Sequence, residues 1–396
     1  MKETFKTYKE NVYSVVLVVN IFIALFFTKL IPFFLGLIIL LWIFKYRDFS
    51  SFSLKMKWIW PFIFYALMFL CSFIFAEDYK EALKILERHI SFIMLPFLIF
   101  CKKWTNKELN FFGEFYVKAV LFIVLFSLIQ LFYFYITNLS FIDKMDSTYL
   151  QWKLPHLIGF HPTYFGLNIV VASILLSSSL IPKQELLKEK NFYIFCFLSI
   201  YLLYISPRTA LFCQLLLWCW FIFKYFINSR VFKINNTLLI ITLFSLIITI
   251  LFTSEYFLDK MSKVLSDQRF LLWSPSFEII KENYFLFGEG LGNGKIRMSH
   301  YILENNLTQF KGSDLHNQYL MNFLDQGIAG VIAMILLIFR PLFLLKNNYN
   351  RLFFIIFAIS MLTESFLYVI KGIIMFIILS SYFILNSLKQ IDQKQK

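Results

Sequence analysis

The longest interruption between the apolar runs of this chain is the stretch 253–327, which reads TSEYFLDKMSKVLSDQRFLLWSPSFEIIKENYFLFGEGLGNGKIRMSHYILENNLTQFKGSDLHNQYLMNFLDQG. It carries arginine and tryptophan side chains, a run of alternating glycines and two histidines. A connection of this length between membrane spans is more often functional than merely connecting. We therefore interpret 253–327 as the lid or wall of an active site.

The composition places the chain in a membrane. Hydrophobic residues make up 59% and charged residues 16% of the sequence, with 52 Phe residues, and a soluble fold does not need so many apolar side chains. The formal net charge of +14 would suggest a nucleic-acid partner in a soluble protein. In a membrane protein the positions of the charges matter more than their sum, so we expect membrane lipids as partners and no nucleic acid.

A helix that crosses a bilayer needs roughly 20 apolar residues, and fewer where the bilayer is thin. We predict an all-α polytopic membrane protein with about 12 transmembrane helices and one long outer loop. Two long apolar runs are split, one at Ser206-Pro207-Arg208 and one near Lys371-Gly372, where proline and glycine permit a turn. The predicted spans are 12–28, 30–44, 58–76, 89–101, 116–137, 162–181, 192–206, 207–227, 236–253, 328–345, 351–369 and 371–388.

The distribution of Lys and Arg predicts the orientation. The face that holds both termini collects 22 of these residues, against eight in the short loops of the other face, so the termini are predicted to be cytoplasmic. The predicted parts are 1–252 with spans one to nine, the outer loop 253–327, and 328–396 with the last three spans and a cytoplasmic tail. All five histidines then fall on the outer face, which favours proton-transfer chemistry there.

Helix ends on the outer face suggest an anion site, because helix amino termini carry partial positive charge and unpaired N–H groups. Three such ends begin at His161, Ser206 and Ser313. Ser206 fits an N-cap and Pro207 the first helical position, which puts Arg208 in the first turn, where its planar guanidinium can hold a phosphate. Alternatively, Arg208 reaches out to lipid headgroups.

His316 is predicted near the start of a helix that runs from Ser313 through Phe323 into the next span. A positive helix end disfavours imidazolium, so a neutral His316 could accept a proton; alternatively it is a polar surface histidine. Arg269 precedes an amphipathic spacing that includes Trp273, which predicts a helix on the outer surface with a possible kink at Pro275.

The glycine run from Gly288 through Gly290 to Gly294 does not match a dinucleotide fingerprint, because the third glycine is misplaced and the run follows a helix. It predicts a tight turn that lets backbone approach a ligand, or simply a flexible loop. The sequence has no HExxH, CxxC, Walker or paired-carboxylate pattern, so we expect no metal and no cofactor. Two basic groups and a neutral base at an outer surface suit a lipid pyrophosphate that carries a sugar.

Five motifs, in this order, resemble the O-antigen ligase and O-antigen polymerase superfamily of bacterial membrane glycosyltransferases. They are Gly159-Phe160-His161-Pro162, Ser206-Pro207-Arg208-Thr209-Ala210, Arg269-Phe270-Leu271-Leu272-Trp273, Phe285-Leu286-Phe287-Gly288-Glu289-Gly290-Leu291-Gly292, and His316-Asn317-Gln318-Tyr319-Leu320 followed by Gly327-Ile328-Ala329-Gly330. The motifs cover about 155 to 340, and the expected topology covers the whole chain.

The resemblance implies a GT-C-like enzyme of the bacterial inner membrane with a periplasmic active site. Such an enzyme takes a glycan from undecaprenyl pyrophosphate and transfers it to an acceptor without metal or nucleotide sugar. By position, His316 resembles the catalytic histidine, and Arg208 and Arg269 resemble the pair that grips the pyrophosphate. The motifs further suggest substrate contacts at six positions, namely His161, Trp273, Gly288, Gly290, His300 and Asn317.

Within this superfamily the favoured expectation is an O-antigen ligase with the lipid A-core oligosaccharide as acceptor. An O-antigen polymerase or a protein O-oligosaccharyltransferase would use the same machinery. A secondary transporter or lipid flippase of about twelve spans is the alternative from a different class, and it would place ionisable groups near the bilayer midplane.

Overall fold

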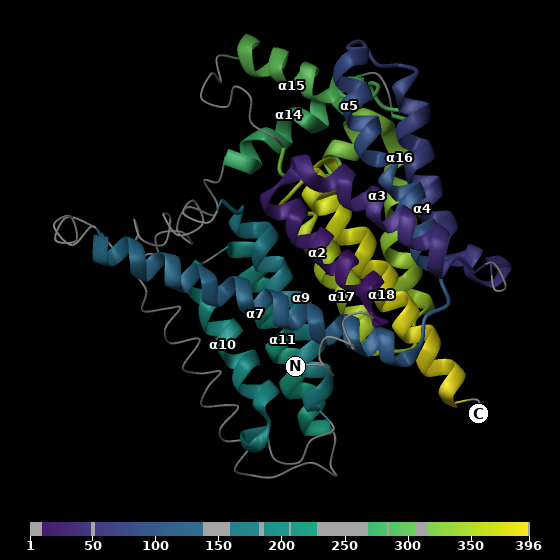
Figure 1. The fold of residues 1–396 in the computed structure, drawn as a ribbon. Coiled ribbons are helices and arrows are strands. Elements are labelled where there is room, and N and C mark those ends of the chain that lie inside the picture. The colour runs from purple at the N-terminus through teal and green to yellow at the C-terminus, as the bar shows by residue number, and fades with distance from the viewer. Residues whose placement is uncertain are drawn as a thin grey trace. The chain divides into compact units, whose positions relative to one another are not determined.

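The computed structural model describes residues 10–48, 52–137, 159–181, 186–205, 207–227, 268–282, 285–305 and 315–394 (Figure 1). In these ranges every named element is a helix, and the β-type pairing is an isolated bridge between Arg47 and Lys102. The chain divides into two compact units, one made of 1–109 with 265–396 and the other of 110–264. Each unit is described by itself.

The first unit contains most of the helices. They are α2 (Val12–Phe26), α3 (Ile31–Leu41), α4 (Phe52–Phe73), α5 (Tyr79–His89), α6 (Ser91–Phe100), α14 (Gln268–Glu282), α15 (Asn293–Glu304), α16 (Gln318–Leu344), α17 (Asn348–Ser360) and α18 (Ile370–Lys394), with short turns at Thr28–Leu30, Trp42–Tyr46 and Phe366–Tyr368. The second unit contains α9 (Pro162–Leu180), the turn Leu186–Lys188, α10 (Lys190–Ile205), α11 (Arg208–Ile227) and most of α7 (Asn106–Thr137).

The protein is a helical membrane protein. Six of its described helices are long and apolar enough to cross a bilayer, namely Thr28–Tyr46, Lys55–Phe73, Asn106–Thr137, Pro162–Leu180, Gln318–Leu344 and Ile370–Lys389. Every predicted span overlaps a helix in part or in full, apart from 236–253, which lies outside the described residues. The all-α membrane class is thus confirmed, while twelve crossings stay a prediction.

The break near Ser206 is where the sequence places it, since α10 ends at Ile205 and α11 begins at Arg208. The second predicted break is confirmed at the start of α18, which begins at Ile370 against a predicted 371, and wrong at the end of α17, which ends at Ser360 against a predicted 369. The helices α17 and α18 are separated by residues 361–369, and Lys371 lies inside the first turn of α18. The physical reason is that this connection contains Glu364, a buried polar side chain that is held by other segments and is not packed as part of an apolar helix.

Helix α18 forms the centre of the first unit, where it packs against α2, α6 and α17 (Figure 1). Its inner face is built from stacked phenyl rings, for example Phe353 against Phe383 with ring centroids 4.6 Å apart. On the other side of α6 lies α4, which packs against α16. This arrangement makes α4 and α16 the pair on which the candidate site is built.

Helix α16 changes direction at Gly327, whose φ of 65° and ψ of −162° are not helical. Before Gly327, Asn322 contacts Tyr65 of α4 and Asp325 contacts Ser72, two turns further along α4. After Gly327 the chain runs back along α4 towards its beginning. There the Arg340 guanidinium lies 4.6 Å from the ring centroid of Trp60. The second segment of α16 therefore starts at residue 328, the residue where the sequence predicts the start of a span.

Loops that the sequence assigns to one face lie together within the first unit. At the predicted cytoplasmic face, Arg47 pairs with Lys102, and the Lys55 ammonium donates to the Lys102 carbonyl. At the predicted outer face, the Glu77 backbone N–H donates to the Asn293 side chain of the long loop at 2.9 Å. The structure therefore agrees with the grouping of these loops.

In the second unit, α9 packs against α10 and α11. A Cβ at Gly166 would lie 2.7 Å from the Pro207 ring and 2.8 Å from Ala210. Glycine is thus required one turn after the start of α9 for the start of α11 to approach. The helix ends that carry His161 and Arg208 consequently lie at the same end of this unit.

Candidate functional site

The candidate site is centred on His316 and Glu364. His316 lies just before α16 with a left-handed φ of 48°, a conformation that non-glycine residues rarely adopt and that clusters at functional sites. Its Nδ1 atom is 3.2 Å from Oε2 of Glu364, and the two side chains are 35% and 6% exposed. A buried carboxylate is therefore paired with one nitrogen of a partly exposed imidazole.

Helix α16 begins later than predicted. The sequence suggests a helix from Ser313; Ser313 lies outside the described residues, and residues 315–317 are not helical. Asn317 is the N-cap, and its side chain accepts from the backbone N–H groups of Tyr319 and Leu320. The backbone N–H of Gln318, the first residue of α16, donates to the Met361 carbonyl at 2.8 Å. Protein groups thus occupy several donors of this helix end, which argues against an open anion site there.

The segment that carries Glu364 is held from two sides. The Leu367 N–H donates to Oε1 of Gln318 at 2.6 Å, and the Leu367 carbonyl lies 2.8 Å from Nε2 of His89. The imidazole of His89 is itself buried and stacks on Phe69 with ring centroids 3.5 Å apart. Helices α5 and α16 together therefore fix the position of the carboxylate.

A polar network beneath His316 joins α16 to α4. Gln318 and Asn322, which are one turn apart and fully buried, are linked by a hydrogen bond of 2.7 Å. The Asn322 side chain also donates to the Tyr65 hydroxyl at 3.1 Å. Buried polar groups that satisfy one another make a rigid core, so His316 stands next to a well-ordered support.

Trp273 lies beside His316 in the structure. Its indole N–H donates to the carbonyl of Leu315, the residue before His316, at 2.9 Å. Helix α14, which carries Trp273, packs against α16 and continues through Pro275. Arg269 is the second residue of α14, and its side chain lies outside the described part of the chain.

The glycine run packs onto α16. The backbone N–H groups of Gly292 and Gly294 donate to the Asp325 carboxylate at 3.1 and 3.0 Å, and that carboxylate also accepts from the Tyr368 hydroxyl at 2.9 Å. A Cβ at Gly288 would overlap the backbone of α16 at Gln326. The close approach that Gly288 and its neighbours allow is therefore to the protein itself.

The remaining predicted site residues are distributed over both units. His300 is exposed on α15 in the first unit. His161 is the exposed N-cap of α9, and Arg208 is the half-buried first residue of α11, both in the second unit. The structure thus places Trp273 beside the segment that carries His316 and Asn317. It places the glycines about two turns further along α16, against Asp325, and it groups His161 with Arg208 in the second unit.

Sequence reasoning missed Glu364. A signal was present, because Glu364 is the only acidic residue between Asp325 and Asp392, within an otherwise apolar region. Ionisable residues in such segments are costly and usually functional. Its pairing with a histidine 48 positions away could not be read from any local pattern.

The pair has the geometry of a carboxylate-oriented general base. When Nδ1 carries the proton and donates it to Glu364, the lone pair is on Nε2, which can accept a proton from a hydroxyl. The carboxylate then stabilises the imidazolium that forms, as in the triads of hydrolases. Among the described residues, no group of three or more His, Cys, Asp or Glu side chains is placed to hold a metal ion.

No family model matches the chain. A relative in Haemophilus influenzae, named only as an uncharacterized protein, is 31% identical over 153 residues, which cover 33% of this chain and 36% of the relative. The chain thus spans about a third of the length of this relative, and the similarity carries no functional assignment.

Proposed function

We propose that this protein is a membrane glycosyltransferase that moves a glycan from undecaprenyl pyrophosphate to the lipid A-core oligosaccharide, in the manner of an O-antigen ligase. The observation that carries the proposal is the 3.2 Å contact between His316 and Glu364. The resemblance of the motifs around Arg208, Arg269 and His316 gives this base its reaction class. In the proposal, twelve spans place both termini in the cytoplasm and the site at the periplasmic face of the inner membrane.

The proposed reaction is a single displacement at the anomeric carbon. Nε2 of His316 removes the proton from an acceptor hydroxyl, whose oxygen forms the new bond to the anomeric carbon with inversion. The bond between that carbon and the pyrophosphate oxygen breaks, and undecaprenyl pyrophosphate leaves with the electron pair. Proton transfer by such a base contributes typically about 10²–10⁴-fold, and Glu364 orients the ring and stabilises the imidazolium that forms.

The pyrophosphate is assigned to Arg208 and Arg269. A guanidinium stays charged and holds phosphate oxygens through two parallel hydrogen bonds, so it can stabilise the departing charge without a metal. Arg208 at the first turn of α11 is supported in this role by the partial positive charge of the helix end. His161 belongs to the same end of that unit and is assigned to the donor as well.

The chemistry of the site does not distinguish a ligase from an O-antigen polymerase, because both use the same donor and the same base. The test is reconstitution of the protein in proteoliposomes with a glycan on undecaprenyl pyrophosphate, with and without lipid A-core. A ligase gives one capped product that requires the core, whereas a polymerase gives a ladder without it. Movement of the intact donor across the bilayer with no new glycosidic bond would reject both and identify a flippase.

A further inference from the structure

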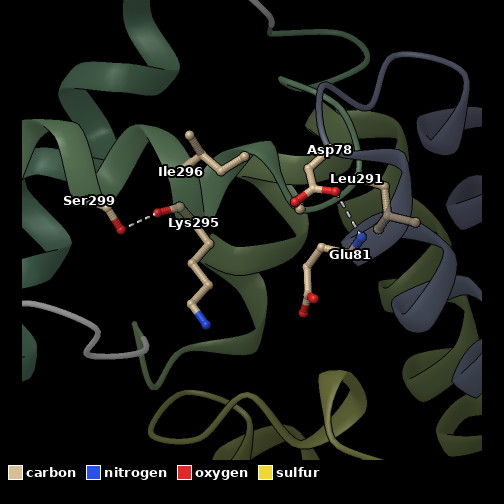
Figure 2. Close-up of a pocket in the computed structure, with 7 residues that line it drawn as sticks. Asp78, Glu81, Leu291, Lys295, Ile296 and Ser299 are labelled. Carbon is tan, nitrogen blue, oxygen red and sulfur yellow. Dashed lines mark hydrogen bonds between the residues drawn. The ribbon is translucent and has the colours of Figure 1, made fainter.

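A pocket separate from the His316 and Glu364 pair opens between α5 and α15 (Figure 2). Its cavity volume is about 220 Å³, which is smaller than the about 300–1,000 Å³ typical of pockets for drug-sized ligands and suits a ligand of a single small ring. The lining comes from the first turn of α5 and from the glycine run with the start of α15. The lining residues are Asp78, Glu81, Leu291, Gly292, Lys295, Ile296 and Ser299.

The walls of this pocket are fixed to each other. The Asn293 side chain accepts from the Glu77 N–H at 2.9 Å and donates to the Phe75 carbonyl at 3.0 Å, so the start of α15 is tied to the loop before α5. The floor residue Gly292 donates to Asp325 of α16. A cavity with preformed walls loses little entropy when a ligand binds.

The charges around the pocket favour a neutral ligand with many hydroxyl groups. Glu81 and the Asp78 carboxylate, whose Oδ1 caps α5, supply acceptors, and Lys295 supplies a donor. The Ser299 hydroxyl donates to the Lys295 carbonyl at 2.8 Å, so towards a ligand it acts as an acceptor. An ion pair of 2.9 Å between Lys84 and Glu81 and the hydrogen bond from Lys84 lower the pKa of the Glu81 carboxyl, so Glu81 is ionised at neutral pH. The two carboxylates are thus balanced by the ammonium groups of Lys84 and Lys295, and a lining with little net charge favours an uncharged ligand.

The floor adds an apolar surface. Leu291 and Ile296 also line the pocket, and in the view of Figure 2 their side chains lie on opposite sides of the two carboxylates. A sugar ring presents hydroxyl groups at its rim and C–H groups on its faces, so it matches carboxylates and an ammonium around an aliphatic floor. A divalent cation fits less well, because the described lining provides two acidic side chains together with a lysine.

We infer that this pocket is a carbohydrate-binding site that holds one sugar unit of a glycan, with Asp78 and Glu81 accepting hydroxyl hydrogen bonds and Lys295 donating one. The inference goes beyond the proposed function, which assigns no residue of α5 and no subsite for the glycan away from the reacting bond. It rests on the pocket alone and is tested by binding, so that it fails or holds independently of transfer.

The experiment uses saturation-transfer difference NMR on the full-length protein in nanodiscs, with glucose, galactose, mannose and N-acetylglucosamine as probes. We expect transfer signals from at least one of the four sugars. Glu81→Gln should weaken the binding of that sugar by about tenfold, because the amide keeps an acceptor oxygen but loses the charge that strengthens the hydrogen bond. Ser299→Trp, which fills the pocket, should abolish the signal.

Glu87→Gln is the matched control, because Glu87 is exposed on the same helix but does not line the pocket; it should leave the signal unchanged. Thermal unfolding of each variant checks that the fold is retained. Absence of a signal from all four sugars, equal signals in wild type and Ser299→Trp, or displacement of the sugar by inorganic phosphate would each overturn the inference. If the protein transfers a glycan but binds no sugar in this pocket, only the inference about the pocket is refuted. If it binds a sugar in the pocket but transfers no glycan, only the proposed function is refuted.

Discussion

The imidazole of His316 and the carboxylate of Glu364 lie 3.2 Å apart, although 48 positions separate them in the sequence. The contact joins the entry of α16 to the connection between α17 and α18. Since the carboxylate is nearly buried and the imidazole is partly exposed, the carboxylate can orient the ring while the ring meets a substrate. This relationship gives the proposed reaction its base.

Glu364→Gln tests the role of the carboxylate, because the amide keeps the size of the side chain but loses the charge that stabilises an imidazolium. We expect kcat to fall by roughly 10²–10⁴-fold, with a smaller change in KM. The measurement is steady-state transfer from a lipid-linked glycan in proteoliposomes. Glu114→Gln, an exposed position on α7, should behave as wild type, and an unchanged kcat for Glu364→Gln would remove Glu364 from the mechanism.

The His89 ring tests whether α5 positions the carboxylate segment. His89→Phe keeps a ring against Phe69 but loses the contact between Nε2 and the Leu367 carbonyl. We expect a lower kcat with an unchanged KM, because the base is misplaced while the substrate contacts remain. His89→Gln, which can still donate to that carbonyl, should recover part of the loss. Equal defects in both variants would show that His89 only fills space.

Gly288 tests the packing of the glycine run on α16. Its φ of 70° and its position against the Gln326 backbone leave no room for a methyl group. Gly288→Ala should therefore destabilise the protein by about 1–3 kcal/mol, the typical cost of a strained backbone conformation, seen as a lower unfolding temperature in detergent. Gly36→Ala is the matched control, since Gly36 lies in α3 with open space around it, and it should be neutral or slightly stabilising. The reverse ranking would contradict the packing described above.

Arg208 tests the assignment of the pyrophosphate. Arg208→Ala should reduce kcat/KM for the lipid-linked donor, and Arg208→Lys should restore only part of it, because an ammonium keeps the charge but not the two parallel hydrogen bonds. The measurement is donor titration at a fixed acceptor concentration. Full activity of the lysine variant would indicate a simple charge effect, and full activity of the alanine variant would exclude Arg208 from donor binding.

Local features of the sequence predict much of the helical framework. Proline fixes the starts of α9 and α11, as the first residue of α9 at Pro162 and as the residue just before α11 at Pro207, one position earlier than predicted. Gly327 precedes the helical segment that starts at residue 328. These signals work because they act on the backbone of the residue that carries them. The early end of α17 at Ser360 was not predicted for the opposite reason, since the connection that follows it is held by Gln318 and His89 from distant segments.

The parts of the site also divide into those that local sequence features indicate and those that depend on contacts between distant segments. His316 and Trp273 could be selected from residue type and position, and the structure brings them side by side through Leu315. The function of the glycine run could not be predicted, because its partner is the side chain of Asp325 more than 30 positions away. The role of Glu364 could not be predicted either, because it is indicated only by the contact with His316 that forms when the protein folds.

The most direct test of the central claim is glycan transfer by His316→Ala, compared with wild type in proteoliposomes that hold equal amounts of inserted, folded protein. The account predicts that wild type forms the glycosidic bond and that the variant forms none above background, while still binding the lipid-linked donor. Transfer by His316→Ala at the wild-type rate would contradict it.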